Sequence, residues 1–127
     1  MSDTNLKVLV VDDEEDSLEL VKDTIRNLGF NVIAVSNGIE ALKVLQDTSD
    51  IKVVLADLVM SGMNGIELVK EARKRGIRQK FIIITAYGEM DSYIEAMNLG
   101  VVDYINKPIN SDQLIQLIAK AVEYERD

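Results

Sequence analysis

Five short apolar runs, separated by stretches with helical spacing, constrain the fold of this chain most strongly. The runs are continuous and rich in β-branched residues, which is typical of strands covered on both faces, as in a parallel sheet. Between the runs, apolar residues recur at helical intervals, as in Leu18, Val21, Ile25 and Leu28 and again in Leu114, Ile118 and Ala121. This alternation predicts a (βα)5 chain with strands near positions 8–11, 32–35, 53–56, 81–84 and 101–105.

Turn-forming residues agree with this division of the chain. Gly29, Gly76 and Gly100 each follow a helical stretch, where a C-terminal glycine is expected. Ser111 precedes the last helical stretch and is predicted to cap it. We find no linker and no low-complexity segment, so residues 1–127 are expected to form a single domain with a core of about residues 5–123.

The strand order follows from how apolar each run is. Right-handed crossovers and two covered faces favour a doubly wound α/β sheet. The first, third and fourth runs are the most apolar and should be central, whereas the fifth is interrupted by Asp103 and suits an edge. The expected order is 2-1-3-4-5, the flavodoxin-like order, with its switch point between strands 1 and 3.

Composition narrows the available chemistry. The chain has no Cys and no His, so residues 1–127 cannot form thiolate or imidazole metal sites or carry out histidine-based catalysis. The net charge of −8 opposes direct binding to nucleic acid or to anionic membranes. No apolar run reaches the ~20 residues needed to cross a bilayer, and the polar start is not typical of a signal peptide. We therefore expect a cytoplasmic domain.

Residues with useful chemistry collect where the predicted strands end. The carboxyl ends of parallel strands lie on one edge of the sheet, so residues far apart in the sequence converge there. These residues are Asp12 and Asp13 after the first run, Asp57 after the third, Thr85 after the fourth, and Lys107 with Pro108 after the fifth.

Three carboxylates on adjacent strand ends repel one another unless a cation neutralises them. A small set of oxygen ligands suits Mg²⁺, which commonly takes one or two carboxylates together with phosphate oxygens. With Lys107 and Thr85 on the other side of Asp57, the edge suits a phosphoryl group. Each residue alone also has a structural explanation: the acids at 12–16 could complement a helix N-terminus, and Asp57 could be a loop or cap residue. The functional interpretation rests on their occurring together.

These segments resemble those of response-regulator receiver domains, and the resemblance covers about residues 5–123. It rests on Val8 to Glu14, on Leu55 to Met60 with Asn64-Gly65, on Ile84-Thr85-Ala86, and on Gly100 to Tyr104 with Lys107-Pro108.

The resemblance implies a phosphorylation switch in two-component signalling, not a conventional enzyme. It implies that Asp57 accepts a phosphoryl group from a histidine kinase or a histidine phosphotransfer protein. Asp13, Asp57 and the backbone carbonyl of Val59 would hold Mg²⁺, with Asp12 acting mainly through water. Lys107 would pair with the phosphoryl oxygens, and the bond from Lys107 to Pro108 would be cis.

The resemblance also implies a switch pair, Thr85 and Tyr104. Their movement would remodel the face formed by the fourth helix, the fifth strand and the fifth helix, where a downstream protein or effector domain binds. The sequence does not decide whether phosphorylation produces a homodimer, nor whether this is a stand-alone regulator or part of a longer protein. One departure is notable: Ser61 stands where the family commonly has proline, which should loosen that loop.

Three other functions fit parts of this pattern. An aspartate-nucleophile phosphohydrolase also combines a parallel sheet, Mg²⁺ and lysine, but places its nucleophile after the first strand. A flavin carrier of the same topology would need a phosphate-binding loop where this chain has Asp-Asp-Glu-Glu at 12–15. A pseudo-receiver would keep the fold as an interaction module without phosphorylation, and the complete set of strand-end residues argues against it.

Overall fold

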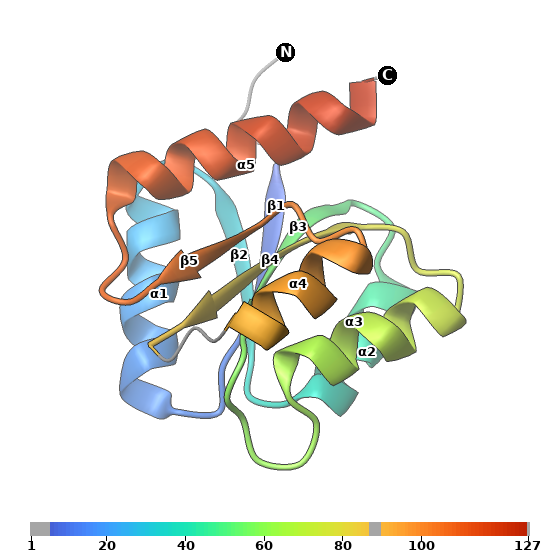
Figure 1. Ribbon diagram of the computed structural model, residues 1–127. Coiled ribbons are helices and arrows are strands. Elements are labelled where there is room, and N and C mark those ends of the chain that lie inside the picture. The colour runs from blue at the N-terminus through green and yellow to red at the C-terminus, as the bar shows by residue number, and fades with distance from the viewer. Residues whose placement is uncertain (1–5, 87–89, 127) are drawn as a thin grey trace.

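The computed structural model describes residues 6–86 and 90–126, apart from the side chains of residues 90, 91 and 123–126. Strands and helices alternate from the first strand to the last helix (Figure 1). In chain order they are β1 (Lys7–Val11), α1 (Glu15–Asn27), β2 (Asn31–Val35), α2 (Gly38–Asp47), β3 (Ile51–Asp57), α3 (Gly65–Lys74), β4 (Lys80–Thr85), α4 (Met90–Asn98), β5 (Asp103–Asn106) and α5 (Ser111–Arg126).

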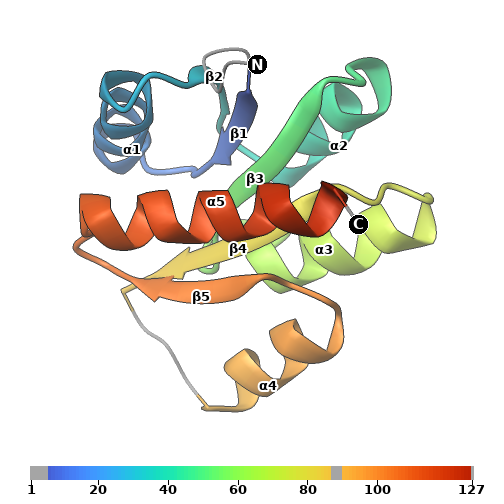
Figure 2. The same ribbon diagram turned by 90° about the horizontal axis from the view of Figure 1, so that it is seen from above.

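The five strands form one parallel sheet in the order β2-β1-β3-β4-β5, which confirms the predicted topology. Successive residues of each strand point to opposite faces, so each inner strand supplies two cores. Leu9 and Val11 pack on the side of α2, α3 and α4, whereas Val8 and Val10 pack on the side of α1 and α5. The helices accordingly lie on both faces of the sheet (Figures 1 and 2).

The expected helical stripes face these cores. Val21 and Ile25 of α1 are buried, and so are the three apolar residues that define the inner face of α5. Helices α1, α3 and α4 are each followed by a glycine with positive φ (Gly29, Gly76 and Gly100), as predicted. In the part of the chain that the structure describes, no helix is long and apolar enough to cross a membrane.

Two local predictions were wrong. Ser111 is the first residue of α5, and Asn110 caps the helix instead: its side-chain oxygen accepts from the Gln113 N–H at 3.0 Å. Val101 and Val102 precede β5 and do not belong to it. The Val102 N–H donates to the Phe81 carbonyl at 2.8 Å, so this pair connects α4 to the sheet and is buried without being a strand.

Candidate functional site at the carboxyl edge of the sheet

Two buried carboxylates lie at the switch point between β1 and β3. Asp57 is the last residue of β3, and Asp12 directly follows β1. As whole residues, Asp57 and Asp12 are only 8% and 3% exposed, although both strands end at the surface edge of the sheet. Asp12 Oδ1 accepts from the Glu14 N–H at 3.0 Å, and Asp57 Oδ1 accepts from the Val59 N–H at 3.2 Å. Backbone donors therefore orient both carboxylates within their own turns.

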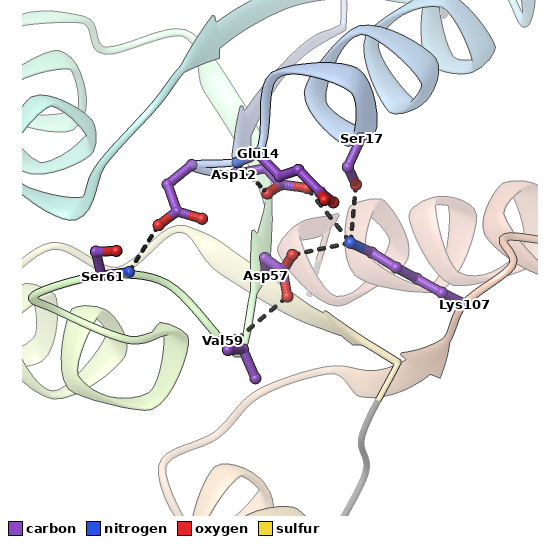
Figure 3. Close-up of polar contacts among 8 residues, drawn as sticks. Asp12, Glu14, Ser17, Asp57, Val59, Ser61 and Lys107 are labelled. Atoms are coloured by element: carbon purple, nitrogen blue, oxygen red, sulfur yellow. Dashed lines mark hydrogen bonds and ion pairs between the residues drawn. The ribbon is translucent and has the colours of Figure 1, made fainter.

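Lys107, which directly follows β5, bridges these two carboxylates and offsets part of their negative charge. Its Nζ lies 2.9 Å from Asp57 Oδ2 and 3.4 Å from Asp12 Oδ2. It also donates to the Ser17 hydroxyl of α1 at 2.8 Å (Figure 3). An ammonium has three donors, and these three oxygens accept from all of them. The lysine thus ties β1, β3 and α1 together over sequence separations of 95, 50 and 90 residues.

Ser17 is a member of the site that the sequence did not reveal. It lies in the first turn of α1, among acidic residues that suggested only a favourable charge at a helix N-terminus. A serine at such a position has no spacing or neighbour that predicts a contact with a lysine just beyond the last strand.

The charges in this cluster have shifted affinities for protons. Burial, reinforced by the neighbouring Asp12 charge, raises the pKa of Asp57 despite the hydrogen bond from Lys107. For Lys107, burial lowers the pKa, but the hydrogen bond and charge of Asp57 outweigh it and raise the pKa overall. The fold therefore keeps a buried carboxyl group that depends on nearby positive charge to stay ionised.

Asp13 lies outside this lysine cluster. Its carboxylate is on the exposed surface, and Asp13 Oδ2 accepts from the backbone N–H of Ser61 at 2.7 Å. Ser61 is in the loop between β3 and α3, on the opposite side of Asp57 from Lys107 (Figure 3). The two aspartates that the resemblance assigns to Mg²⁺ are thus held by different partners.

A pocket of about 330 Å³ opens beside Asp57, and its lining is suited to a hard cation. Asp13, Asp57 and Val59 line it together with Glu14, Ala86 and Lys107. Among the described residues no three acidic side chains gather tightly enough to form a metal cluster, and Asp12 is turned toward Lys107. Because Mg²⁺ needs only one or two carboxylates and keeps several waters, the oxygen donors of this pocket fit it.

The remaining predicted residues lie around this edge. Thr85, the last residue of β4, is fully buried, and its carbonyl accepts from the Lys107 N–H at 2.9 Å. The peptide bond between Lys107 and Pro108 is cis. Tyr104 lies on β5, where its ring meets the Tyr93 ring edge-on with the centroids 5.6 Å apart.

Gly65 brings α3 against the strand that carries Asp57. A Cβ atom at this position would lie 2.7 Å from the Asp57 carbonyl oxygen and 3.2 Å from the Leu58 Cα. The Gly65 N–H donates to the Leu58 carbonyl at 3.0 Å, and Asn64 caps α3 through a reciprocal capping box with Glu67. The absence of a side chain at residue 65 allows this close approach.

Residues 8–119 match the family model described as the response regulator receiver domain. This chain belongs to the response-regulator receiver family. Domains of this family are phosphoacceptor switches of two-component systems; the family generally binds Mg²⁺ at the phosphorylation site, and its members interact with histidine kinases and downstream effectors.

Relatives and solved structures agree with this assignment. The receiver is 33% identical over 120 residues to a putative NtrX-like response regulator of Rickettsia bellii, covering 93% of this chain and 25% of the relative. It is 34% identical over 127 residues to the transcriptional regulatory protein ZraR of Klebsiella oxytoca, covering 99% of this chain and 28% of the relative. The chain therefore spans about a quarter of the length of these curated relatives.

A crystal structure of a receiver domain protein from Clostridium thermocellum superposes with a TM-score of 0.89 at 30% identity, covering 95% of this chain and 97% of that one. The structure of FixJ-N superposes with a TM-score of 0.88 at 31% identity, covering 97% and 96%. The similarity thus extends over nearly the whole receiver.

Proposed function

We propose that Asp57 is the phosphoacceptor of this receiver domain. The observation that carries the proposal is the 2.9 Å contact between the Lys107 ammonium and the buried carboxylate at the end of β3. A carboxylate nucleophile must approach an anionic phosphoryl group, and a fixed cation beside it lowers the electrostatic cost. Backbone and lysine donors also fix the orientation of the carboxylate before the reaction begins.

The phosphoryl donor would be a phosphohistidine of a histidine kinase or a histidine phosphotransfer protein. One Asp57 carboxylate oxygen forms a bond to phosphorus while the bond from phosphorus to the histidine nitrogen breaks. The electron pair of that bond returns to the imidazole, which takes up a proton from solvent. Because such transfers depend mainly on positioning and charge neutralisation, this chain needs no histidine or cysteine of its own.

Mg²⁺ would be held by Asp13, Asp57 and the Val59 carbonyl, with Asp12 acting through water. When bound, it supplies positive charge to the phosphoryl oxygens. Lys107 would move from Asp57 Oδ2 to a phosphoryl oxygen, while Ser17 remains within reach of the ammonium. This exchange keeps the lysine paired both before and after transfer.

Thr85 and Tyr104 would carry the change to the face formed by α4, β5 and α5. Tyr104 packs against Tyr93 of α4, and the hydroxyl oxygen of Tyr104 is buried. A movement of Tyr104 on β5 would therefore change its packing against α4. Exposed apolar side chains gather on these helices: Tyr93, Ile94, Met97 and Ile115. A downstream protein, an effector domain or a second phosphorylated copy would bind there by burying them.

Intact mass after incubation with acetyl phosphate tests the acceptor assignment. The wild type should gain one phosphoryl group only when Mg²⁺ is present, and Asp57→Asn should gain none. Asp50→Asn, which changes an exposed aspartate at the opposite edge of the sheet, should be phosphorylated like the wild type. A phosphoryl group retained by Asp57→Asn would overturn the assignment, and an unmodified wild type would favour a pseudo-receiver.

A further inference from the structure

The loop between β3 and α3 is tied across the site by one backbone hydrogen bond. The N–H of Ser61 donates to Asp13 Oδ2 at 2.7 Å, a short distance that is typical of a charge-assisted hydrogen bond. It links residues 48 positions apart and lies on the side of Asp57 remote from Lys107 (Figure 3). The ends of the loop are fixed separately, because Leu58 donates to Ile84 at 2.8 Å and Gly65 donates to Leu58 at 3.0 Å.

This hydrogen bond depends on the residue type at position 61. A proline at this position would have no backbone N–H and could not donate the hydrogen bond. The serine hydroxyl takes no part in the contact, because the donor is the main-chain nitrogen. The side chain and the N–H of residue 61 can therefore be removed separately.

Asp13 and Asp57 are oriented by different partners. Ser61 holds the Asp13 carboxylate on one side, and Lys107 holds the Asp57 carboxylate on the other. Mg²⁺ demands near-octahedral geometry with ligand oxygens at roughly 2.0–2.1 Å. A carboxylate that gives electron density to Mg²⁺ becomes a weaker hydrogen-bond acceptor, so binding of the cation by Asp13 would weaken its hydrogen bond to the loop.

We propose that the Ser61 N–H competes with Mg²⁺ for Asp13, so that cation binding releases the middle of the β3–α3 loop. The inference rests on the metal site proposed above. Since coupling between two sites is reciprocal, a partner that holds the loop in its tied position weakens Mg²⁺ binding by the same factor. The position of the middle of the loop therefore depends on whether Mg²⁺ is bound.

Mg²⁺ titration of the unphosphorylated protein, without any phosphodonor, tests the competition. Ser61→Ala keeps the N–H and is the reference, and Ser61→Pro removes the N–H. Ser61→Pro should bind Mg²⁺ roughly twofold to tenfold more tightly than Ser61→Ala, because one exposed hydrogen bond to a charged group no longer has to be broken. Equal or weaker binding by Ser61→Pro would overturn the proposal.

A second measurement avoids proline and its effect on the loop backbone. Amide hydrogen exchange at Ser61 in the wild type should become several-fold faster when Mg²⁺ is saturating. Unchanged or slower exchange at this amide would contradict the release of the loop, whatever the proline variant shows.

The metal site and the competition fail in different ways. If the wild type binds no Mg²⁺, or if Asp13→Asn and Asp57→Asn bind it as well as the wild type, the proposed metal site is wrong and the competition falls with it. If the wild type binds Mg²⁺ through these aspartates but the two Ser61 variants have equal affinity, only the competition is wrong.

Discussion

Two aspartate–lysine ion pairs, one at each edge of the sheet, have the same N–O distance but differ in burial and in the direction of the aspartate pKa shift. Lys107 and Asp57 meet at 2.9 Å at the carboxyl edge, and Lys7 and Asp50 meet at 2.9 Å at the amino edge. The Asp57 side chain is 10% exposed and the Asp50 side chain 59% exposed. Burial raises the pKa of Asp57, whereas the hydrogen bond from Lys7 lowers the pKa of Asp50.

The difference teaches that distance alone does not say what an ion pair does. At the amino edge, water solvates both charges, and such a pair contributes little beyond local order. At the carboxyl edge, the carboxylate has lost most of its water and depends on the lysine and on backbone donors. A buried carboxylate held in this way contributes little to the stability of the fold. It is suited to reacting with a phosphoryl group that arrives together with a cation.

Replacing the lysine of each pair should give the largest difference between the two pairs in the rate of phosphorylation. Lys107→Ala should slow phosphorylation of Asp57 by acetyl phosphate and Mg²⁺ by about a hundredfold, because a fixed cation beside the phosphoryl group is lost. Lys7→Ala should leave the rate unchanged. The measurement is the initial rate followed by intact mass, and equal rates for the two variants would mean that burial confers no special role on Lys107.

The next prediction concerns the packing of α3 against the strand end that carries Asp57. Gly65→Ala should lower the free energy of unfolding by about 1–3 kcal/mol, because its Cβ atom would meet the Asp57 backbone, which cannot move aside. Gly38→Ala is the matched control at the start of α2, where the Cβ atom would meet only side-chain atoms of Met63, the sulfur at 2.7 Å and the Cβ at 3.3 Å, instead of backbone. Urea denaturation of both variants checks this, and an equal cost at the two glycines would contradict it.

The topology and the residues of the site were predictable for one reason. Apolar runs covered on both faces predict a parallel sheet, and a parallel sheet brings all its carboxyl ends to one edge, so Asp12, Asp57 and Lys107 had to converge. The cap of α5 was not predictable in the same way. Asn110 and Ser111 are adjacent and both cap well, and only the backbone path selects Asn110.

The contacts of Ser17 and Ser61 were not predictable from residue type. The Ser61 donor is a backbone N–H, which every residue except proline carries, so the sequence shows that a donor is present at position 61 but not that Asp13 accepts from it. Ser17 reaches Lys107 only because α1 and the end of β5 lie side by side in the folded chain. Both contacts depend on the placement of elements, which a pattern of apolar residues gives only coarsely.

The pH dependence of stability should have opposite signs at the two pairs. Because the folded-state pKa of Asp57 is raised above its ordinary value of 3.8, this group contributes stability below that pH and loses it as pH rises through the folded pKa. The pKa of Asp50 is lowered from 3.8, so its contribution is present above that pH and is lost as pH falls through the folded pKa.

Denaturation in the presence of a chelator, measured across the acid range, checks this opposition. Relative to the wild type, Asp57→Asn should become more stable as pH rises, and Asp50→Asn should become less stable. Parallel trends for the two variants would show that the environments of the two carboxylates differ less than their burial suggests.

The smallest effect is expected at Ser17, because a substitution there removes one acceptor of the Lys107 ammonium and leaves the charges of Lys107 and Asp57 in place. Ser17→Ala should slow phosphorylation by roughly twofold to fivefold, since water can replace the hydroxyl as an acceptor but does not hold the ammonium in place. Ser17→Thr keeps the hydroxyl and should recover most of the rate, whereas a purely structural role in α1 would give no such recovery. If alanine and threonine behave alike, Lys107 is positioned by its two carboxylates alone, and the buried pair differs from the exposed pair in solvation only.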